Sequence, residues 1–252
     1  MLLRNAGDEV LAIGQASHAW VSGQIARAWG NERFPAPAPH EAVCLAADQH
    51  DVGWAEWDLR PTLNPETGRP HSFLDMPNLA AHIELWSEAP DKLLTQSTYA
   101  SLLVSLHGTA LYQRRKLEDL SPSDAELVKR YLERERSRQD RLRAALLPDE
   151  QQLARNQRLI WTWDSLSLAL CLPWDPHTAT RVPASDGEVD LHMRLTGPDR
   201  FELTPWPFTS SEVRVHCEGR RLAGRYETPV ELHAALCEAP IEPLAFTLAR
   251  PV

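Results

Sequence analysis

Histidine and aspartate residues within apolar helical segments are the side chains of this sequence that could do chemistry. His50 and Asp51 are neighbours at the end of a predicted helix, where both side chains can reach one cation. An imidazole nitrogen together with a carboxylate oxygen suits a first-row divalent metal. The dipeptide alone is more simply interpreted as a helix-terminal histidine beside a solvated aspartate, so its role depends on the residues around it.

Three histidines, His18, His50 and His107, occupy core-facing positions of predicted helices. A single inward histidine is usually a core residue with a satisfied hydrogen bond. Three of them each need a buried partner, and a shared metal ion would serve all three. The alternative is that they are separate core residues of some other helical bundle.

Asp164 lies in the segment 159–172, which is apolar on nearly every face. An unpaired carboxylate in a buried helix is costly, so it neutralises or finds a cation. A metal ion is one such cation. An ion pair with Arg158, or an interaction with Ser167, is the alternative.

Helices must position these residues, because apolar residues recur with the helical period up to about residue 172. The predicted helices span residues 14–29, 40–51, 78–86, 97–115, 122–147 and 150–172. Beyond residue 173 the apolar pattern alternates and prolines are frequent, which is typical of strands. Strands are expected at 189–195, 201–203, 213–216, 222–226 and 244–248, with a short helix at 229–237. The sequence therefore predicts a mainly α fold: a helical metal-binding domain at 1–172 and a small antiparallel β-meander at 173–252.

Composition limits the class of protein. The 252 residues carry a formal net charge of −9, which disfavours nucleic-acid binding because that needs a basic surface. No apolar stretch is long enough for a membrane span, and the first residues lack the pattern of a signal peptide, so we expect a cytoplasmic protein. The four cysteines form no C-x-x-C pair, which suggests small core residues in a reducing compartment. The oligomeric state stays open.

The order His18, His50-Asp51, His107 and Asp164 resembles the HD-domain superfamily of metal-dependent phosphohydrolases. The stretch His50-Asp-Val-Gly-Trp54 is similar to that family's H-D-x-G-K, and Asp164-Ser-Leu-Ser is similar to its D-x-L-S. The resemblance covers roughly residues 14 to 172 and implies an HD-like helical bundle. A closer similarity is to an uncharacterised bacterial family with Q-x-x-H, H-D-x-x-W and S-L-H motifs, a family that has no assigned activity.

The resemblance implies a divalent metal centre of one or two ions, which could be Fe, Mn, Zn, Ni or Mg. His82 and His107 occupy places comparable to the two additional histidines of dinuclear members. The implied ligands are His18, His50, Asp51, His82, His107 and Asp164. Asp51 and His107 are the implied catalytic residues.

One departure concerns substrate binding. The lysine that often follows the His-Asp pair in HD phosphohydrolases, and helps to hold phosphate, is Trp54 in this sequence. Arg114 and Arg115 directly follow the helix of His107 and could replace it, because arginine binds phosphate in a bidentate manner. Trp54, Arg114 and Arg115 are therefore the expected substrate-binding residues.

Three functions follow from these residues. The first is a metal-dependent hydrolase that acts on a phosphoester or a related small molecule through metal-activated water. The second is a diiron oxygenase of the HD-like type, which the missing lysine and the aromatic surroundings keep open. The third is a non-catalytic binding protein on an HD-like scaffold.

Overall fold

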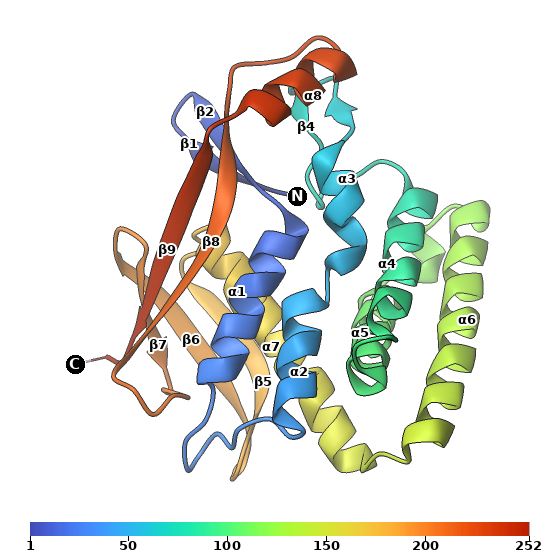
Figure 1. The fold of residues 1–252 in the computed structure, drawn as a ribbon, viewed down its shortest axis with the longest axis vertical. Coiled ribbons are helices and arrows are strands. Elements are labelled where there is room, and N and C mark those ends of the chain that lie inside the picture. Colours follow the sequence, from blue (N-terminus) through green and yellow to red (C-terminus); the bar gives the residue numbers. More distant parts are fainter. Residues whose placement is uncertain (252) are drawn as a thin grey trace.

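A seven-stranded mixed sheet forms one side of the molecule in the computed structural model, which describes residues 1–251. The order of its strands is β1-β2-β8-β9-β7-β6-β5. All neighbouring strands are antiparallel except β7 and β9, which are parallel. The bounds are β1 (Leu2–Ala6), β2 (Glu9–Ile13), β5 (His177–Ala184), β6 (Gly187–Gly197), β7 (Arg200–Thr204), β8 (Glu212–Ala223) and β9 (Ile241–Ala249). Figure 1 shows this sheet on the left, with most helices to its right.

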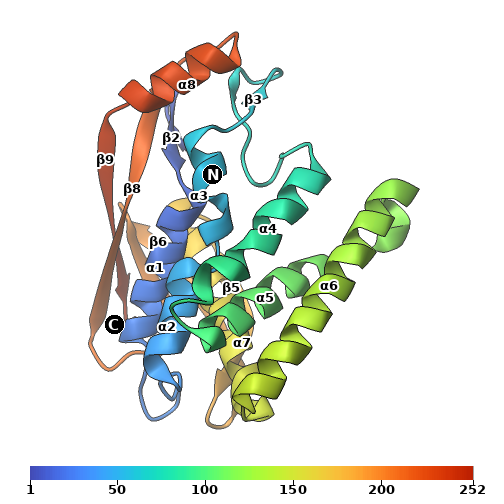
Figure 2. The same ribbon diagram turned by 45° about the vertical axis from the view of Figure 1, so that its right-hand side comes forward.

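The helices lie in successive layers on this sheet. Helices α1 and α7 contact the strands, α2 and α5 pack on them, and α4 and α6 lie farther out, as Figures 1 and 2 show. The bounds are α1 (Gln15–Ala28), α2 (His40–Gln49), α4 (Leu79–Leu93), α5 (Thr98–Gln113), α6 (Pro122–Leu146), α7 (Glu150–Cys171) and α8 (Pro229–Glu238). The segment between α2 and α4 holds the 3-10 turn η1 (Val52–Trp54), the short helix α3 (Ala55–Leu59) and the hairpin of β3 (Leu63–Asn64) and β4 (Arg69–Pro70). A second 3-10 turn, η2 (Leu117–Asp119), precedes α6.

The main core fills the space between the sheet and the helices α1 and α7. Val21 and Ile25 of α1 are fully buried and belong to the same apolar cluster as Val215 and Phe246 of the sheet. Trp163 of α7 joins them from the neighbouring helix. The side chains that line α1 and α7 are therefore fixed by close packing, which makes these helices rigid supports.

The prediction of a mainly α fold with a small C-terminal antiparallel β-meander is wrong. Residues 2–13, to which the sequence pattern assigns no element, form the hairpin β1–β2, and β2 pairs with β8. The hairpin turns at Gly7, whose φ of 72° favours glycine. Val10 to Ile13 are all buried, so β2 is a continuous apolar run whose periodicity does not distinguish a strand from a helix. The parallel β7–β9 pair also rules out a simple meander.

The helical part of the prediction is largely confirmed. The helices predicted at 14–29, 40–51, 97–115, 122–147 and 150–172 correspond to α1, α2, α5, α6 and α7 within one or two residues at each end. Three of these helices begin at a capping residue: the side chains of Ser97, Ser121 and Asp149 each accept a hydrogen bond from the first turn. Helix α4 extends well beyond residue 86. The division at residue 172 stays a prediction, although one sheet contains strands from both sides of it.

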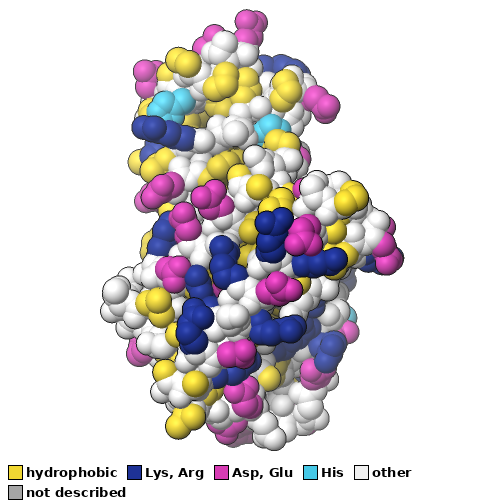
Figure 3. All heavy atoms as spheres, turned by 90° about the vertical axis from the view of Figure 1, so that its right-hand side faces the viewer, with side chains coloured by type: hydrophobic (Ala, Val, Ile, Leu, Met, Phe, Trp, Pro, Cys, Tyr) yellow, Lys and Arg dark blue, Asp and Glu magenta, His cyan; other side chains and the backbone are white. Residues whose placement is uncertain are grey.

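No helix within residues 1–251 has the length and apolar character that a membrane crossing requires. The outer helix α6 instead presents charges of both signs to solvent, and Figure 3 shows Lys and Arg interspersed with Asp and Glu on this side of the molecule. One such pair is Arg130 with Glu126, one turn apart, at 3.4 Å.

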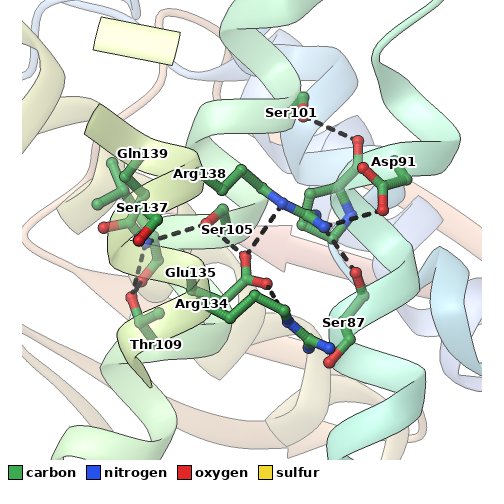
Figure 4. A network of polar contacts seen from close by, with 12 residues as sticks. Ser87, Asp91, Ser101, Ser105, Thr109, Arg134, Glu135, Ser137, Arg138 and Gln139 are labelled. Carbon is green, nitrogen blue, oxygen red and sulfur yellow. Dashed lines mark hydrogen bonds and ion pairs between the residues drawn. The ribbon is translucent and has the colours of Figure 1, made fainter. Parts of the chain in front are cut away.

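A buried polar network holds α6 against α5 (Figure 4). The carboxylate of Glu135 on α6 is fully buried and accepts a hydrogen bond of 2.8 Å from Ser105 Oγ on α5. Arg138 Nε lies 3.6 Å from the same carboxylate, and Gln139 Nε2 donates to Ser105 Oγ at 2.9 Å. Because a buried carboxylate needs such partners, the network fixes the position of α6 on α5. Its member Ser105 lies two residues before His107.

Glu135→Ala is expected to lower the free energy of unfolding by about 2–4 kcal/mol, because it leaves buried donors on α5 and α6 without their acceptor. Urea denaturation of the purified protein measures this change. Glu133→Ala, at an exposed position of the same helix, is the control and should leave stability unchanged. Equal stability of the two variants would show that the network does not hold α6 in place.

Candidate metal centre

Five of the six predicted ligands lie close together, where the four helices α1, α2, α5 and α7 converge. His18 lies on α1, His107 on α5 and Asp164 on α7, while His50 and Asp51 directly follow α2. Their nitrogen and carboxylate atoms form two overlapping groups that could hold a metal ion, His18–His50–Asp51 and His50–His107–Asp164. The alternative that these histidines are separate core residues is therefore wrong.

The turn that carries His50 and Asp51 packs closely on a neighbouring helix. A Cβ atom on Gly53 would lie 1.9 Å from the backbone oxygen of Leu85 on α4, so only glycine allows this approach. Gly53 thereby lets η1 lie against α4 while the preceding Asp51 points back toward α1. The glycine of the His50-Asp-Val-Gly-Trp54 stretch thus supports the position of the site.

The hydrogen bonds of His50 determine which of its nitrogens faces the site. Its Nδ1 lies 2.9 Å from the carbonyl oxygen of Ala47, which only accepts, so Nδ1 carries the hydrogen. The Nε2 atom then presents a lone pair. It lies 3.4 Å from Asp164 Oδ1 and 3.7 Å from Asp51 Oδ2. Within residues 1–251 this fully buried nitrogen has no hydrogen-bond partner.

His18 is held in the same way by Ser167. The Ser167 hydroxyl donates to the carbonyl oxygen of Asp164 at 2.8 Å, so it accepts from His18 Nδ1 at 2.9 Å. The Nε2 of a neutral His18 consequently presents a lone pair to Asp51 Oδ2 at 2.7 Å. Both His18 Nε2 and Asp51 Oδ2 are then hydrogen-bond acceptors, so they need a proton or a metal ion between them at this distance.

In the neutral rings, the free nitrogen of His18 therefore faces Asp51, and that of His50 faces both Asp51 and Asp164, in a buried space. Ligands of a tetrahedral ion at roughly 2.1 Å lie roughly 3.4 Å from one another. The separations between His50 and the two carboxylates are close to this value. The outer hydrogen bonds from His50 to Ala47 and from His18 to Ser167 are of the kind that orients metal-ligating histidines. The residues fit a divalent ion.

The charges of the metal-free site are balanced by protonation. Burial alone would lower the pKa of His50, but Asp51 and Asp164 outweigh it and raise the pKa to about 9. Burial would likewise raise the pKa of Asp164, but its interactions with His50 and His107 lower it to about 2. At neutral pH His50 is therefore cationic and Asp164 is ionised, so a metal ion that binds here replaces a proton.

His107 approaches the site from the side of Asp164. Its Nε2 lies 3.6 Å from Asp164 Oδ2, and burial lowers its pKa to about 4, so the ring is neutral. The two candidate ligand groups share His50, and only one nitrogen of His50 is free. A single lone pair binds one ion, so both groups cannot be filled through His50 at the same time.

A cavity of about 270 Å³ opens above these residues. His18, Asp51, His107 and Asp164 form its polar part. Its other walls are mainly aromatic and aliphatic: Trp54, Phe73, Leu74, Trp86, Leu111, Tyr112 and Leu168, with Gln15, His82 and Arg115 as further polar members. We call this space the metal cavity. Its mixture of apolar walls and convergent polar groups is typical of a small-molecule site.

The predicted substrate-binding residues divide between two places. Trp54 is buried and lines the metal cavity, as does Arg115. The guanidinium of Arg114 instead lies over the ring of Trp161, 3.8 Å from its centre, outside this cavity. His82 lines the cavity but belongs to neither ligand group, and its Nδ1 is hydrogen bonded to the hydroxyl of Tyr112.

Sequence analysis assigned no role to Gln15 or Tyr112, which also line the cavity. Gln15 lies three residues before His18, on the same face of α1, and its buried Oε1 has no hydrogen-bond partner within the described residues. The three-residue spacing between Gln15 and His18 is the sequence signal that could have identified Gln15 as a cavity residue. Tyr112 lies five residues after His107, where helical spacing gives no comparable indication.

Comparison with protein families places the chain in a family of unknown function. Residues 1–224 match the family model described as "Protein of unknown function (DUF3891)", and the chain belongs to this family. Neither the curated proteins nor the solved structures contain a match. The expected membership of the HD-domain superfamily is therefore wrong. The seven-stranded sheet that covers α1 and α7 also departs from the HD-like helical bundle.

His50→Ala is expected to abolish metal binding, because it removes the one ligand common to both groups. Elemental analysis of purified protein should find about one divalent ion per wild-type chain and none in the variant. His40→Ala, at the exposed start of the same helix, is the matched control and should retain the ion. Equal metal content in wild type and His50→Ala would contradict the assignment.

Metal affinity is expected to rise with pH between about 7 and 9, by about tenfold per unit, because His50 must lose its proton before it can bind an ion. Competition with a chromophoric chelator measures the affinity, and calorimetry in buffers of different ionisation enthalpy counts the protons released. An affinity that does not change with pH over this range would show that His50 is not a ligand.

Proposed function

We propose that this chain is a metal-dependent hydrolase of a small anionic molecule, most simply a phosphoester. The observation that carries the proposal is that four members of the two candidate ligand groups, His18, Asp51, His107 and Asp164, line an open, largely apolar cavity. A structural metal site is closed by its protein ligands, whereas a catalytic one keeps a position open toward substrate.

In this proposal His18, His50 and Asp51 hold the ion, and Asp164, which lies 3.4 Å from His50 Nε2, faces it from the second candidate group. A divalent ion in such a site lowers the pKa of water and polarises a phosphoryl or acyl oxygen. Asp51 has one oxygen, Oδ1, without a hydrogen-bond partner in the described chain, so it can also accept a proton from a nucleophile in the cavity. His107 is neutral near pH 7, and its Nε2, 3.6 Å from Asp164 Oδ2, can keep Asp164 oriented.

The rest of the cavity supports an anionic substrate with an apolar portion. Arg115 is exposed and lines the cavity, where its guanidinium can bind an oxyanion. Trp54, Phe73 and Trp86 can pack against a planar or aliphatic group. The amide oxygen of Gln15 offers a buried acceptor for a hydroxyl or a water molecule.

The test is hydrolysis of a panel of phosphate monoesters, phosphate diesters and carboxylic esters by the purified protein supplied in turn with Mn, Zn, Fe, Ni and Mg. Asp164→Asn retains the shape of the side chain but removes its charge, and we expect kcat/KM to fall by roughly a hundredfold or more. Asp186→Asn, at an exposed turn, is the control.

Absence of hydrolysis with every metal, or activity that survives Asp164→Asn, would contradict the proposal. Consumption of oxygen by an iron-loaded protein without ester hydrolysis would favour an oxygenase instead.

A further inference from the structure

A second hollow of about 220 Å³ lies between α5 and α7, next to the metal cavity. It is lined by His107, Ala110, Arg114, Ala154, Gln157, Arg158 and Trp161, and we call it the Arg114 hollow. The ring of His107 separates the two spaces. Its centre lies 5.6 Å from the ring of Trp86 in the metal cavity and 5.6 Å from the ring of Trp161 in the hollow.

Positive charge gathers in this hollow. Arg114 is stacked on Trp161, which leaves the N–H groups at the edge of its guanidinium free to donate. Arg158 is held in place because it donates to the backbone oxygens of Thr180 and Arg181. Those partners are uncharged, so they do not neutralise Arg158. None of the residues that line the hollow, all within the described chain, is acidic.

The surroundings do not cancel this charge. Burial, together with the nearby Arg181 and Arg114, lowers the pKa of Arg158, as expected for a cation crowded by other cations. Two acids act on Arg158: Glu188, which pairs with Arg181 at 2.8 Å, and Asp190, which accepts a hydrogen bond from the backbone of Arg181. In a protein with a net charge of −9, such a local excess of positive charge is notable.

One of the residues that line the hollow has a buried polar atom without a partner. His107 is 1% exposed, and its Nδ1 has no hydrogen-bond partner in the described chain. A buried nitrogen without a partner is costly, so a ligand or water is expected to satisfy it. Hydrogen phosphate could do so in either tautomer of the ring, because it offers both acceptor oxygens and a hydroxyl donor.

We propose that the Arg114 hollow is a binding site for a phosphate-type oxyanion, held by the guanidinium groups of Arg114 and Arg158 and by the ring of His107. Arginine is well suited to this role because its planar fork matches the geometry of an oxyanion. The site is separate from the proposed hydrolytic one, since Arg114 and Arg158 do not line the metal cavity. An anion bound here lies against the histidine that contacts Asp164.

Calorimetric titration of the whole protein with inorganic phosphate, at constant ionic strength, tests the proposal. The wild type is expected to bind, and Arg114→Ala to weaken this binding by roughly tenfold or more. Arg114→Lys, which retains the charge but loses the fork, should lie between the two. Arg114 is exposed, so these variants are expected to fold, and circular dichroism checks this. Arg141→Ala, an exposed change on α6, controls for the loss of one surface charge and should bind as the wild type does.

Arg115→Ala separates this site from the metal cavity. If phosphate binding falls in Arg115→Ala but not in Arg114→Ala, phosphate binds in the metal cavity and the proposal is wrong. Absence of binding to the wild type, or equal affinity of the wild type and Arg114→Ala, also overturns it. A titration with a phosphate monoester in place of inorganic phosphate shows whether the ligand is the free ion or a larger molecule that carries it.

Discussion

Two carboxylates and two imidazole rings lie against one another inside this protein, and the surrounding structure holds them there. Each of these groups is costly to bury without a positively charged or hydrogen-bearing partner. The carbonyl of Ala47 and the hydroxyl of Ser167 orient the histidines so that their free nitrogens point at Asp51 and Asp164. The arrangement is stable only with a cation in its midst, a bound proton in the metal-free protein or a metal ion.

The fold meets this requirement because the candidate ligands lie on, or directly after, helices that are held in place by contacts outside the site. Helices α1 and α7 rest on the sheet through fully buried side chains such as Ile25 and Trp163. Helix α5 is held from its other side by the network around Glu135. Rigid positioning of this kind is what a metal centre needs, because ligands that shift by an ångström lose their ion or their selectivity. The sheet therefore contributes to the site without supplying a ligand.

Five of the ligands could be predicted from the sequence because helical periodicity places them inward. His18, His107 and Asp164 lie among apolar residues at helical spacing, and the structure brings them to one place with His50 and Asp51. Their proximity in the structure shows that these side chains could hold an ion together, which no one of these segments indicates alone.

Strand β2 and the places of Arg114, Arg115 and His82 could not be predicted from the sequence, and each failure has a physical reason. Strand β2 is buried on both faces, so its apolar run lacks the alternation that marks a strand. Arg114 and Arg115 look like one basic pair in the sequence. Neighbouring residues near a helix end point roughly 100° apart, so one lies over Trp161 and the other lines the metal cavity. The position of His82 beside Tyr112 depends on how α4 packs on α5, which local pattern does not determine.

The pairing of β2 with β8 has a consequence for the chain during its synthesis, before it is folded. Glu9 and Arg221, which form an ion pair across these strands, are 212 residues apart. A ribosome makes the N-terminal part first, so every metal ligand emerges before the strands that cover α1 are complete. Until β8 and β9 arrive, the apolar face of α1 and the edge of the β1–β2 hairpin stay uncovered. Such surfaces favour association with other chains until the last quarter of the sequence covers them.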